Sequence, residues 1–171
     1  MLVVEIVISN GHDTDPFRDI AAGVVDTLNH LFAYEMGANF RFAVWDYRLD
    51  PPRLVPAGAL PARSLAMVDR SEAVLAIFGA TLPEITCKEV ARSMEARRAG
   101  QPHDLWVFVD SEHPSAERST FFHELRDEFG EEIQYTSFSS ELDFQAKVFE
   151  TLTLFALKRL DFHLVEAEFL A

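Results

Sequence analysis

One stretch of the chain places side chains that can do chemistry directly after a buried strand. Residues 73–79 read Ala-Val-Leu-Ala-Ile-Phe-Gly, an apolar strand that ends in glycine. A Thr-Cys-Lys-Glu sequence at 86–89 then opens a helix that runs to Gly100. In an α/β protein, ligands usually bind at the carboxyl edge of the sheet. Cys87 and Glu89 should therefore stand at that edge, one as a candidate nucleophile and the other as a candidate catalytic carboxylate.

Both residues also have purely structural explanations. Thr86-x-x-Glu89 fits a capping box, in which the glutamate accepts a hydrogen bond from the N-cap amide and suits the helix dipole. Spacing alone does not separate this cap from a catalytic role for Glu89. Cys87 has no histidine at an obvious partner position, so a small packed cysteine is the favoured interpretation of that residue.

Other candidate binding residues lie where further strands should end. Trp45 and Asp46 close an aromatic strand at 40–45. An indole there can stack on a base and a carboxylate can bind ribose hydroxyls, although Trp45 fits a core position equally well. Gly79 permits a close backbone approach to a ligand. Asp110 ends another strand, and it also fits the start of a turn with Ser111.

Length and composition favour one folded domain. The chain has 171 residues and 19.4 kDa, with 49% apolar residues, which is enough for one sizeable core. Met1 leads straight into an apolar strand without a basic segment or cleavage site, so neither a signal peptide nor a membrane span is expected. A single cysteine excludes an internal disulfide and suits a reducing, cytoplasmic location.

The charge narrows the range of partners. A net charge of −13 and a pI near 4.8 repel a nucleic-acid backbone, so no nucleic-acid partner is expected. Small anionic nucleotides remain possible, because helix N-termini bind phosphate locally. The six histidines show no metal-ligand spacing, and neither a metal site nor a cofactor is predicted.

Strands and helices alternate along the whole chain, which predicts an α/β fold with a five-stranded parallel sheet and helices on both faces. The expected strands are residues 2–9, 40–45, 73–79, 105–110 and 133–138, the last of them short, polar and at an edge. Asp15, Ser115 or Ser119, and Ser140 are the expected N-caps of three helices. Four prolines make residues 47–61 a long loop after the second strand.

The last helix is too long for the sheet that it covers. Residues 141–170 should form a helix of about 42 Å, whereas a six-residue strand spans about 20 Å. We therefore expect residues 1–171 to form one domain whose C-terminal helix is an interface or a connector. A second copy of the chain, or an attached effector domain, would cover its far half.

This order of elements resembles the TIR fold, which is related to the flavodoxin-like arrangement. The first strand and polar loop (3–13), the variable loop (47–61) and the helix start at 86–90 match TIR features. Trp45-Asp46 and the Asp-Arg-Ser sequence at 69–71 resemble motifs of TIR-like domains in bacterial signalling and defence proteins. Two features depart from the pattern: no tryptophan precedes Cys87, and the Ser-Gly pair before the helix is missing. Both allow a binding scaffold without catalysis.

The resemblance implies a function, because TIR-like domains and the similarly folded nucleoside 2-deoxyribosyltransferases cleave N-glycosidic bonds with a glutamate at this helix start. It implies that Glu89 acts on a ribosyl–base bond, with NAD as substrate. It also implies that the loop carrying Ser9, Asp13 and Arg18 lines the pocket, where the arginine could hold phosphate. A solvated turn with a surface arginine is the alternative for this loop. A non-catalytic oligomerisation module and deoxyribosyl transfer remain alternatives for the protein.

Overall fold

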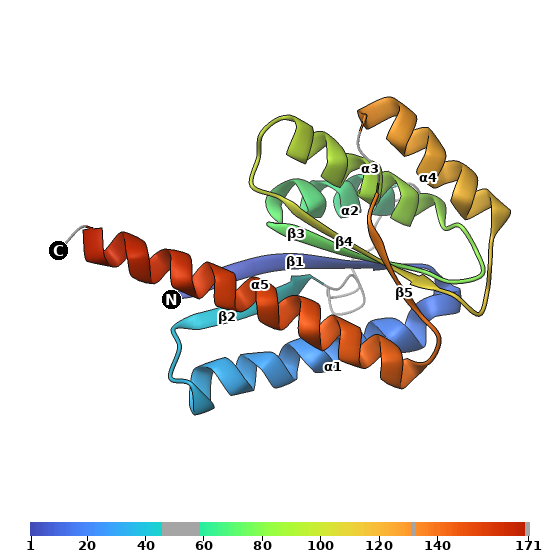
Figure 1. Cartoon of the computed structure of the whole chain (residues 1–171). Helices are drawn as coiled ribbons and strands as arrows, with labels where there is room; N and C mark the ends of the chain where they lie inside the picture. The colour runs from blue at the N-terminus through green and yellow to red at the C-terminus, as the bar shows by residue number, and fades with distance from the viewer. Residues whose placement is uncertain (46–58, 131–132, 170–171) are drawn as a thin grey trace.

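Five parallel strands form the centre of the molecule, in the order β2-β1-β3-β4-β5 (Figure 1). The computed structural model describes residues 1–45, 59–130 and 133–169. The strands are β1 (Leu2–Asn10), β2 (Phe40–Trp45), β3 (Ala73–Phe78), β4 (Asp104–Asp110) and β5 (Tyr135–Phe138). The parallel sheet expected from the alternating pattern is confirmed, and β5 lies at the edge as predicted.

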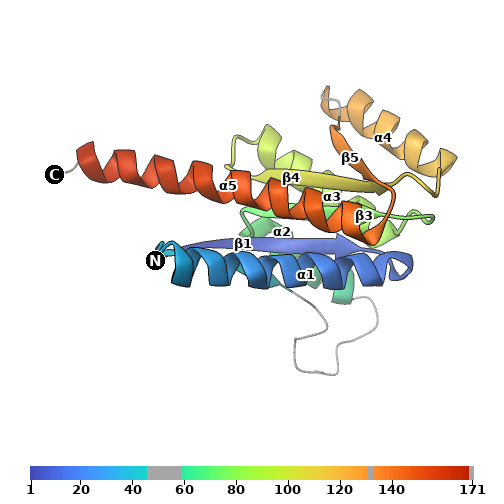
Figure 2. The same ribbon diagram turned by 60° about the horizontal axis from the view of Figure 1, so that its bottom comes forward.

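Five α-helices connect and cover these strands. They are α1 (Asp15–His30), α2 (Ala59–Arg70), α3 (Glu84–Arg98), α4 (Ala116–Phe129) and α5 (Glu141–Phe169). A 3₁₀ turn, η1 (His12–Thr14), precedes α1, and a short π-helix, η2 (Leu31–Glu35), continues it. Helices α1 and α5 lie on one face of the sheet, and α2, α3 and α4 lie on the other (Figures 1 and 2).

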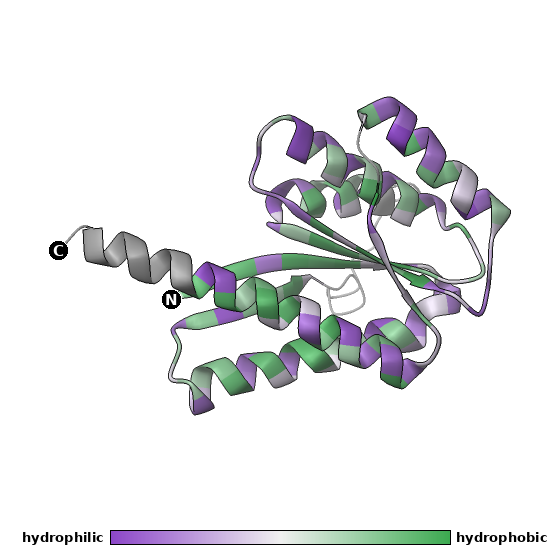
Figure 3. Cartoon of the chain, in the orientation of Figure 1, coloured by the Kyte–Doolittle hydropathy of each residue, from purple (hydrophilic) through white to green (hydrophobic). Residues whose placement is uncertain are grey.

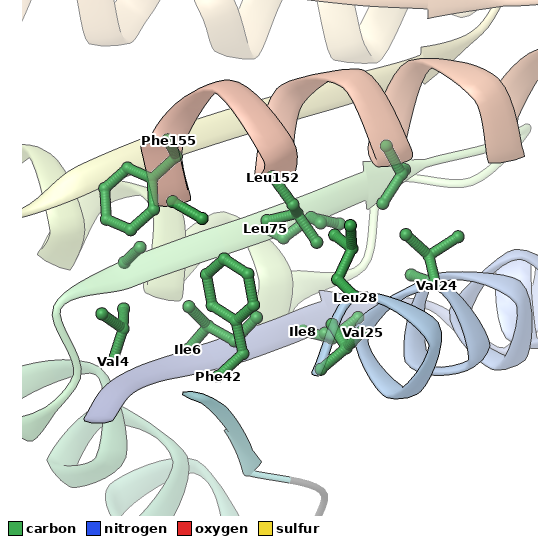
Figure 4. Close-up of a cluster of buried hydrophobic side chains, with 14 of the residues drawn as sticks. Val4, Ile6, Ile8, Val24, Val25, Leu28, Phe42, Leu75, Leu152 and Phe155 are labelled. Carbon is green, nitrogen blue, oxygen red and sulfur yellow. The ribbon is translucent and has the colours of Figure 1, made fainter. Parts of the chain in front are cut away.

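The strands supply apolar side chains to both faces, because alternate residues of a strand point in opposite directions. On β1, Ile6 and Ile8 pack with α1 and α5, in the core shown in Figure 4, while Val7 packs towards α2 and α3. Apolar residues accordingly run along the central strands, and α4 presents a largely hydrophilic surface (Figure 3). Ser9 follows Val7 by two residues, so it faces the α2–α3 layer.

Helix ends agree with the sequence at most positions. Ser115 accepts a hydrogen bond from the Arg118 amide at the start of α4, and Ser140 accepts one from the Asp143 amide at the start of α5. Asp15 was expected to be the N-cap of α1. That prediction is wrong by one residue: Thr14 holds the N-cap position, and Asp15 is the first helical residue.

The C-terminal helix has the predicted length. Helix α5 contains 29 residues, and its C-terminal part extends beyond the sheet (Figure 1). In the part of the chain that the structure describes, no helix is long and apolar enough to cross a membrane. Most of the proline-rich loop expected at 47–61 lies outside the described residues.

Candidate active site

Glu89 occupies a core-facing position of α3. The buried residues of this helix are Thr86, Glu89, Val90, Ser93 and Met94, which recur at spacings of three and four. That spacing marks one helical face, and here it is the face that packs on β3 and β4. A carboxylate thus replaces an apolar side chain near the carboxyl edge of the sheet, and only 4% of Glu89 is exposed.

The capping-box explanation of Glu89 is wrong for this structure. Helix α3 begins at Glu84, two residues earlier than expected, and Pro83 holds the N-cap position without a side-chain hydrogen bond. Thr86 lies inside the first turn, and its buried hydroxyl has no hydrogen-bond partner. The Glu89 carboxylate instead accepts a hydrogen bond from the Ser9 hydroxyl at the end of β1. The sequence placed the helix start too late, and the cap prediction followed from that error.

Burial changes the acidity of Glu89. Desolvation raises the pKa of the Glu89 carboxyl from its ordinary 4.5 to about 7, while the Ser9 hydrogen bond and the charge of Arg18 oppose the shift. A carboxyl with a pKa of about 7 exchanges its proton near neutral pH. Such values are typical of groups that act as acids or bases in active sites.

Arg18 is buried and does not lie at the surface. It is 1% exposed, and one of its guanidinium nitrogens donates to the side-chain oxygen of Asn10 at 3.3 Å. Its charge acts on Glu89. The surface-arginine alternative for this residue is therefore wrong. Arg18 is also absent from the described wall of the pocket.

A pocket of about 890 Å³ opens in front of Ser9 and Glu89. This volume lies within the range of small-molecule sites. The predicted residues Asp13 and Trp45 also line it, and Trp45 is half-buried there. Asp46 lies outside the described residues. Sequence reasoning missed part of the lining: Ile8, Asn10, Gly11, His12, Ser64, Thr81, Pro83, Glu84 and Ile85.

The Asp13 side chain packs against Gly79. The close approach expected at Gly79 is therefore made by the β1–α1 loop, which carries Asp13. The Asp13 carboxylate accepts hydrogen bonds from the Thr81 amide at 3.0 Å and from the Thr81 hydroxyl at 2.7 Å. A Cβ at Gly79 would stand 2.6 Å from an Asp13 oxygen and 2.7 Å from a methyl carbon of Thr14. Glycine at 79 thus lets the β1–α1 and β3–α3 loops join at the pocket rim. Gly79 itself is not in the described lining.

The two remaining candidates have structural roles. Burial raises the pKa of the Cys87 thiol to about 11, so it is protonated at neutral pH and is a poor nucleophile, as the sequence indicated. One Asp110 oxygen accepts a hydrogen bond from the Glu112 amide at 2.9 Å, and the other contacts His113 at 2.8 Å. Asp110 therefore closes a turn, which was the simpler of its two interpretations.

Metal ligands are not grouped in the described part of the chain. Among residues 1–45, 59–130 and 133–169, no cluster of three or more His, Cys, Asp or Glu side chains could hold an ion.

Comparison with solved structures identifies the fold. The chain superposes on a TIR domain from the heterodimer of the RPS4 and RRS1 TIR domains with a TM-score of 0.55, at 12% identity, over 91% of this chain and 99% of that one. The protein therefore has a TIR-like fold, as the resemblance in sequence implied. No protein-family model and no curated protein matches the sequence.

Two other solved structures show weaker similarity. A CMP N-glycosidase from Clostridium botulinum, BcmB, gives a TM-score of 0.45 at 10% identity, over 84% of this chain and 97% of that one. A homoserine dehydrogenase from S. aureus also gives 0.45, at 9% identity, over 79% of this chain and 33% of that one.

The burial of Glu89 predicts how stability should depend on pH. Between pH 4.5 and about 7 the folded protein binds more protons at this site than the unfolded chain, so the unfolding free energy should fall as pH rises through this range. Glu89→Gln removes this pH-dependent decrease of the unfolding free energy. Between pH 5.5 and 8.5 the stability of the variant relative to the wild type should rise by about 2 kcal/mol, because each pH unit from 5.5 up to the pKa of about 7 contributes about 1.36 kcal/mol. Urea unfolding across this range measures the difference.

Glu95→Gln is the matched control, because Glu95 lies on the same helix with 52% of its side chain exposed. Its effect on the unfolding free energy should be nearly constant over the same pH range. A Glu89→Gln effect that is equally flat would show that the Glu89 carboxyl titrates at its ordinary pKa.

The contact between Gly79 and Asp13 predicts a local cost for a methyl group. Gly79→Ala should push the Asp13 carboxylate off Thr81 and destabilise the protein by about 1–3 kcal/mol in urea unfolding. Gly23→Ala is the control: it lies within α1, with no atom near its added Cβ, and should be neutral or stabilising. Equal changes of the unfolding free energy in the two variants would contradict the contact between the β1–α1 and β3–α3 loops at Gly79.

Proposed function

We propose that this protein is a TIR-like enzyme that hydrolyses the nicotinamide–ribose bond of NAD, with Glu89 as its catalytic carboxylate. The observation that carries the proposal is the placement of this one side chain. Glu89 is buried, accepts from Ser9 and borders an open pocket at the carboxyl edge of the sheet. The TIR-like fold and the Cys-Lys-Glu sequence at 87–89 of α3 support the same reaction.

The chemistry needs one carboxylate beside the ribose. As the glycosidic bond breaks, its electron pair leaves with the nicotinamide nitrogen, and positive charge develops at C1′ and the ring oxygen. A nearby carboxylate stabilises this oxocarbenium-like centre or captures it, as in glycosidases. Water then completes the hydrolysis. In a pocket of low polarity, the charge of Glu89 acts more strongly than it would in water.

Four neighbours assist Glu89 in this proposal. Ser9 orients the carboxylate through its hydroxyl, and Arg18 contributes positive charge. Trp45 offers an aromatic wall on which the base can stack. Ser64 is 7% exposed and enters the pocket from α2, where its hydroxyl can bond to the ribose.

Purified protein incubated with NAD should release nicotinamide, and Glu89→Gln should abolish the release. The rate should rise with pH through about 7, because the ionised carboxylate is the active form. Chromatography of the products measures nicotinamide directly, and a pH profile from 5.5 to 8.5 gives the apparent pKa.

Glu95→Gln makes the same chemical change far from the pocket on the same helix, so it should keep full activity. No nicotinamide release at high protein concentration would refute the proposal. Exchange of the base between a deoxynucleoside and a free base, without NAD hydrolysis, would instead identify a deoxyribosyltransferase.

A second candidate function is assembly, which exposed apolar residues on α5 favour. Leu142, Phe149 and Leu157 recur at spacings of seven and eight, so they share one side of the helix, and they are 76%, 37% and 38% exposed. The TIR domains of RPS4 and RRS1 form a heterodimer. We infer that α5 of this chain joins it to a second copy or to an effector domain.

Light scattering across concentration should show a species larger than the monomer, and Leu157→Asp should shift it towards the monomer without unfolding the chain. Met36→Asp is the control, since Met36 is 53% exposed and lies after η2, away from this stripe. A strict monomer at all concentrations would exclude self-association through α5.

A further inference from the structure

The charges around the pocket bear on the class of substrate that it accepts. Its described lining contains three acidic residues, Asp13, Glu84 and Glu89, and no lysine or arginine. His12 is the one described lining residue that could become a cation, and its side chain is 93% exposed to water. The chain as a whole carries −13. A phosphate that enters this part of the pocket meets like charge.

The buried arginines nearby are engaged with other parts of the protein. Arg118 donates to the carbonyl oxygen of Gly79 at 2.7 Å and to that of Asp110 at 3.5 Å, so it ties the ends of β3 and β4 together. Arg18 donates to Asn10, and its charge acts on the Glu89 carboxyl. Neither guanidinium belongs to the described pocket wall.

The two helix N-termini beside the pocket are also poor phosphate sites. A helix N-terminus binds phosphate through unpaired backbone amides. Pro16 in the first turn of α1 and Pro83 before α3 have no amide proton to offer. Carboxylates already lie at the starts of both helices. Asp15 accepts a hydrogen bond from the Asn10 side chain at 2.9 Å, and Glu84 forms an ion pair with Lys88 at 2.5 Å.

The rest of the wall suits a flat ring with positive charge. Trp45, Ile8, Pro83 and Ile85 supply apolar surface to the pocket. An indole face attracts a cation by about 0.5–2 kcal/mol, depending on its exposure to water. A cationic ring between this indole and the Glu89 carboxylate gains both attractions. A neutral base gains neither charge interaction.

We propose that the described part of the site recognises ribonucleosides of a planar cationic base, of the pyridinium kind, through the base and ribose, and that a phosphate gains no favourable contact from the described residues. This inference rests on the proposed N-glycosidic hydrolysis. The C1′–N bond breaks with its electron pair on the ring nitrogen, so the cationic base leaves as a neutral molecule. Water adds to C1′ and its proton passes to the Glu89 carboxylate. In NAD, only the nicotinamide riboside part would be bound by these residues.

The test compares nicotinamide riboside with nicotinamide mononucleotide, which differ by one phosphate. At low ionic strength the riboside should be hydrolysed with a kcat/KM equal to or higher than that of the mononucleotide. Added salt should reduce any advantage of the riboside, because it screens the acidic rim. A higher kcat/KM for the mononucleotide at low salt would overturn the inference.

A binding measurement separates this inference from the proposed reaction. The chain has two tryptophans, so Trp106→Phe leaves Trp45 as the single fluorescent indole. Nicotinamide riboside should quench Trp45 at concentrations no higher than those of the mononucleotide, and lower than those of the neutral nucleoside uridine. The same order without any hydrolysis would refute the reaction but support the substrate class. No quenching by the riboside up to about 1 mM, the upper end of ordinary KM values, would overturn the substrate class.

Discussion

The buried carboxylate of Glu89 is the constraint on which the arrangement of the site depends. An ionised carboxylate away from water is costly unless it has hydrogen bonds and a compensating charge. Ser9 supplies the hydrogen bond and Arg18 the positive charge, yet desolvation still dominates and the pKa stays near 7. Helix α3, the end of β1 and the start of α1 must therefore keep their relative positions, because each contributes one member of this group.

Two glycines make those positions possible. Gly79 leaves room for the Asp13 carboxylate, which in turn holds the amide and hydroxyl of Thr81. A Cβ at Gly11 would stand 2.4 Å from the ring of Pro83, the residue before α3. The loop after β1 and the loop after β3 thus interlock at two points. Because these loops lead to α1 and α3, the same contacts fix the distance between Arg18 and Glu89.

Much of the fold could be predicted from the sequence, because apolar strand runs, glycine-ended helices and serine caps are local signals. The site was harder to predict, because the wrong predictions concern the direction in which individual side chains point. A capping role for Glu89 stayed open beside the catalytic one because Thr86 looked like a helix start, although the spacing of Val90 and Met94 already marks Glu89 as core-facing. Nothing local shows that Arg18 is buried or that Asp13 meets Gly79, because both depend on how distant loops pack.

The protonation state of Glu89 also connects the stability of the free protein to the class of substrate that we propose. At neutral pH the Glu89 carboxyl of the free protein is protonated in a large fraction of molecules, because burial disfavours its charge. A cationic base placed beside it would favour the ionised form, by the same coupling that lets an opposite charge lower a carboxyl pKa. Substrate binding would then supply the charge that bond cleavage requires. A neutral nucleoside would leave Glu89 largely protonated, so the pocket would discriminate against it both in binding and in chemistry.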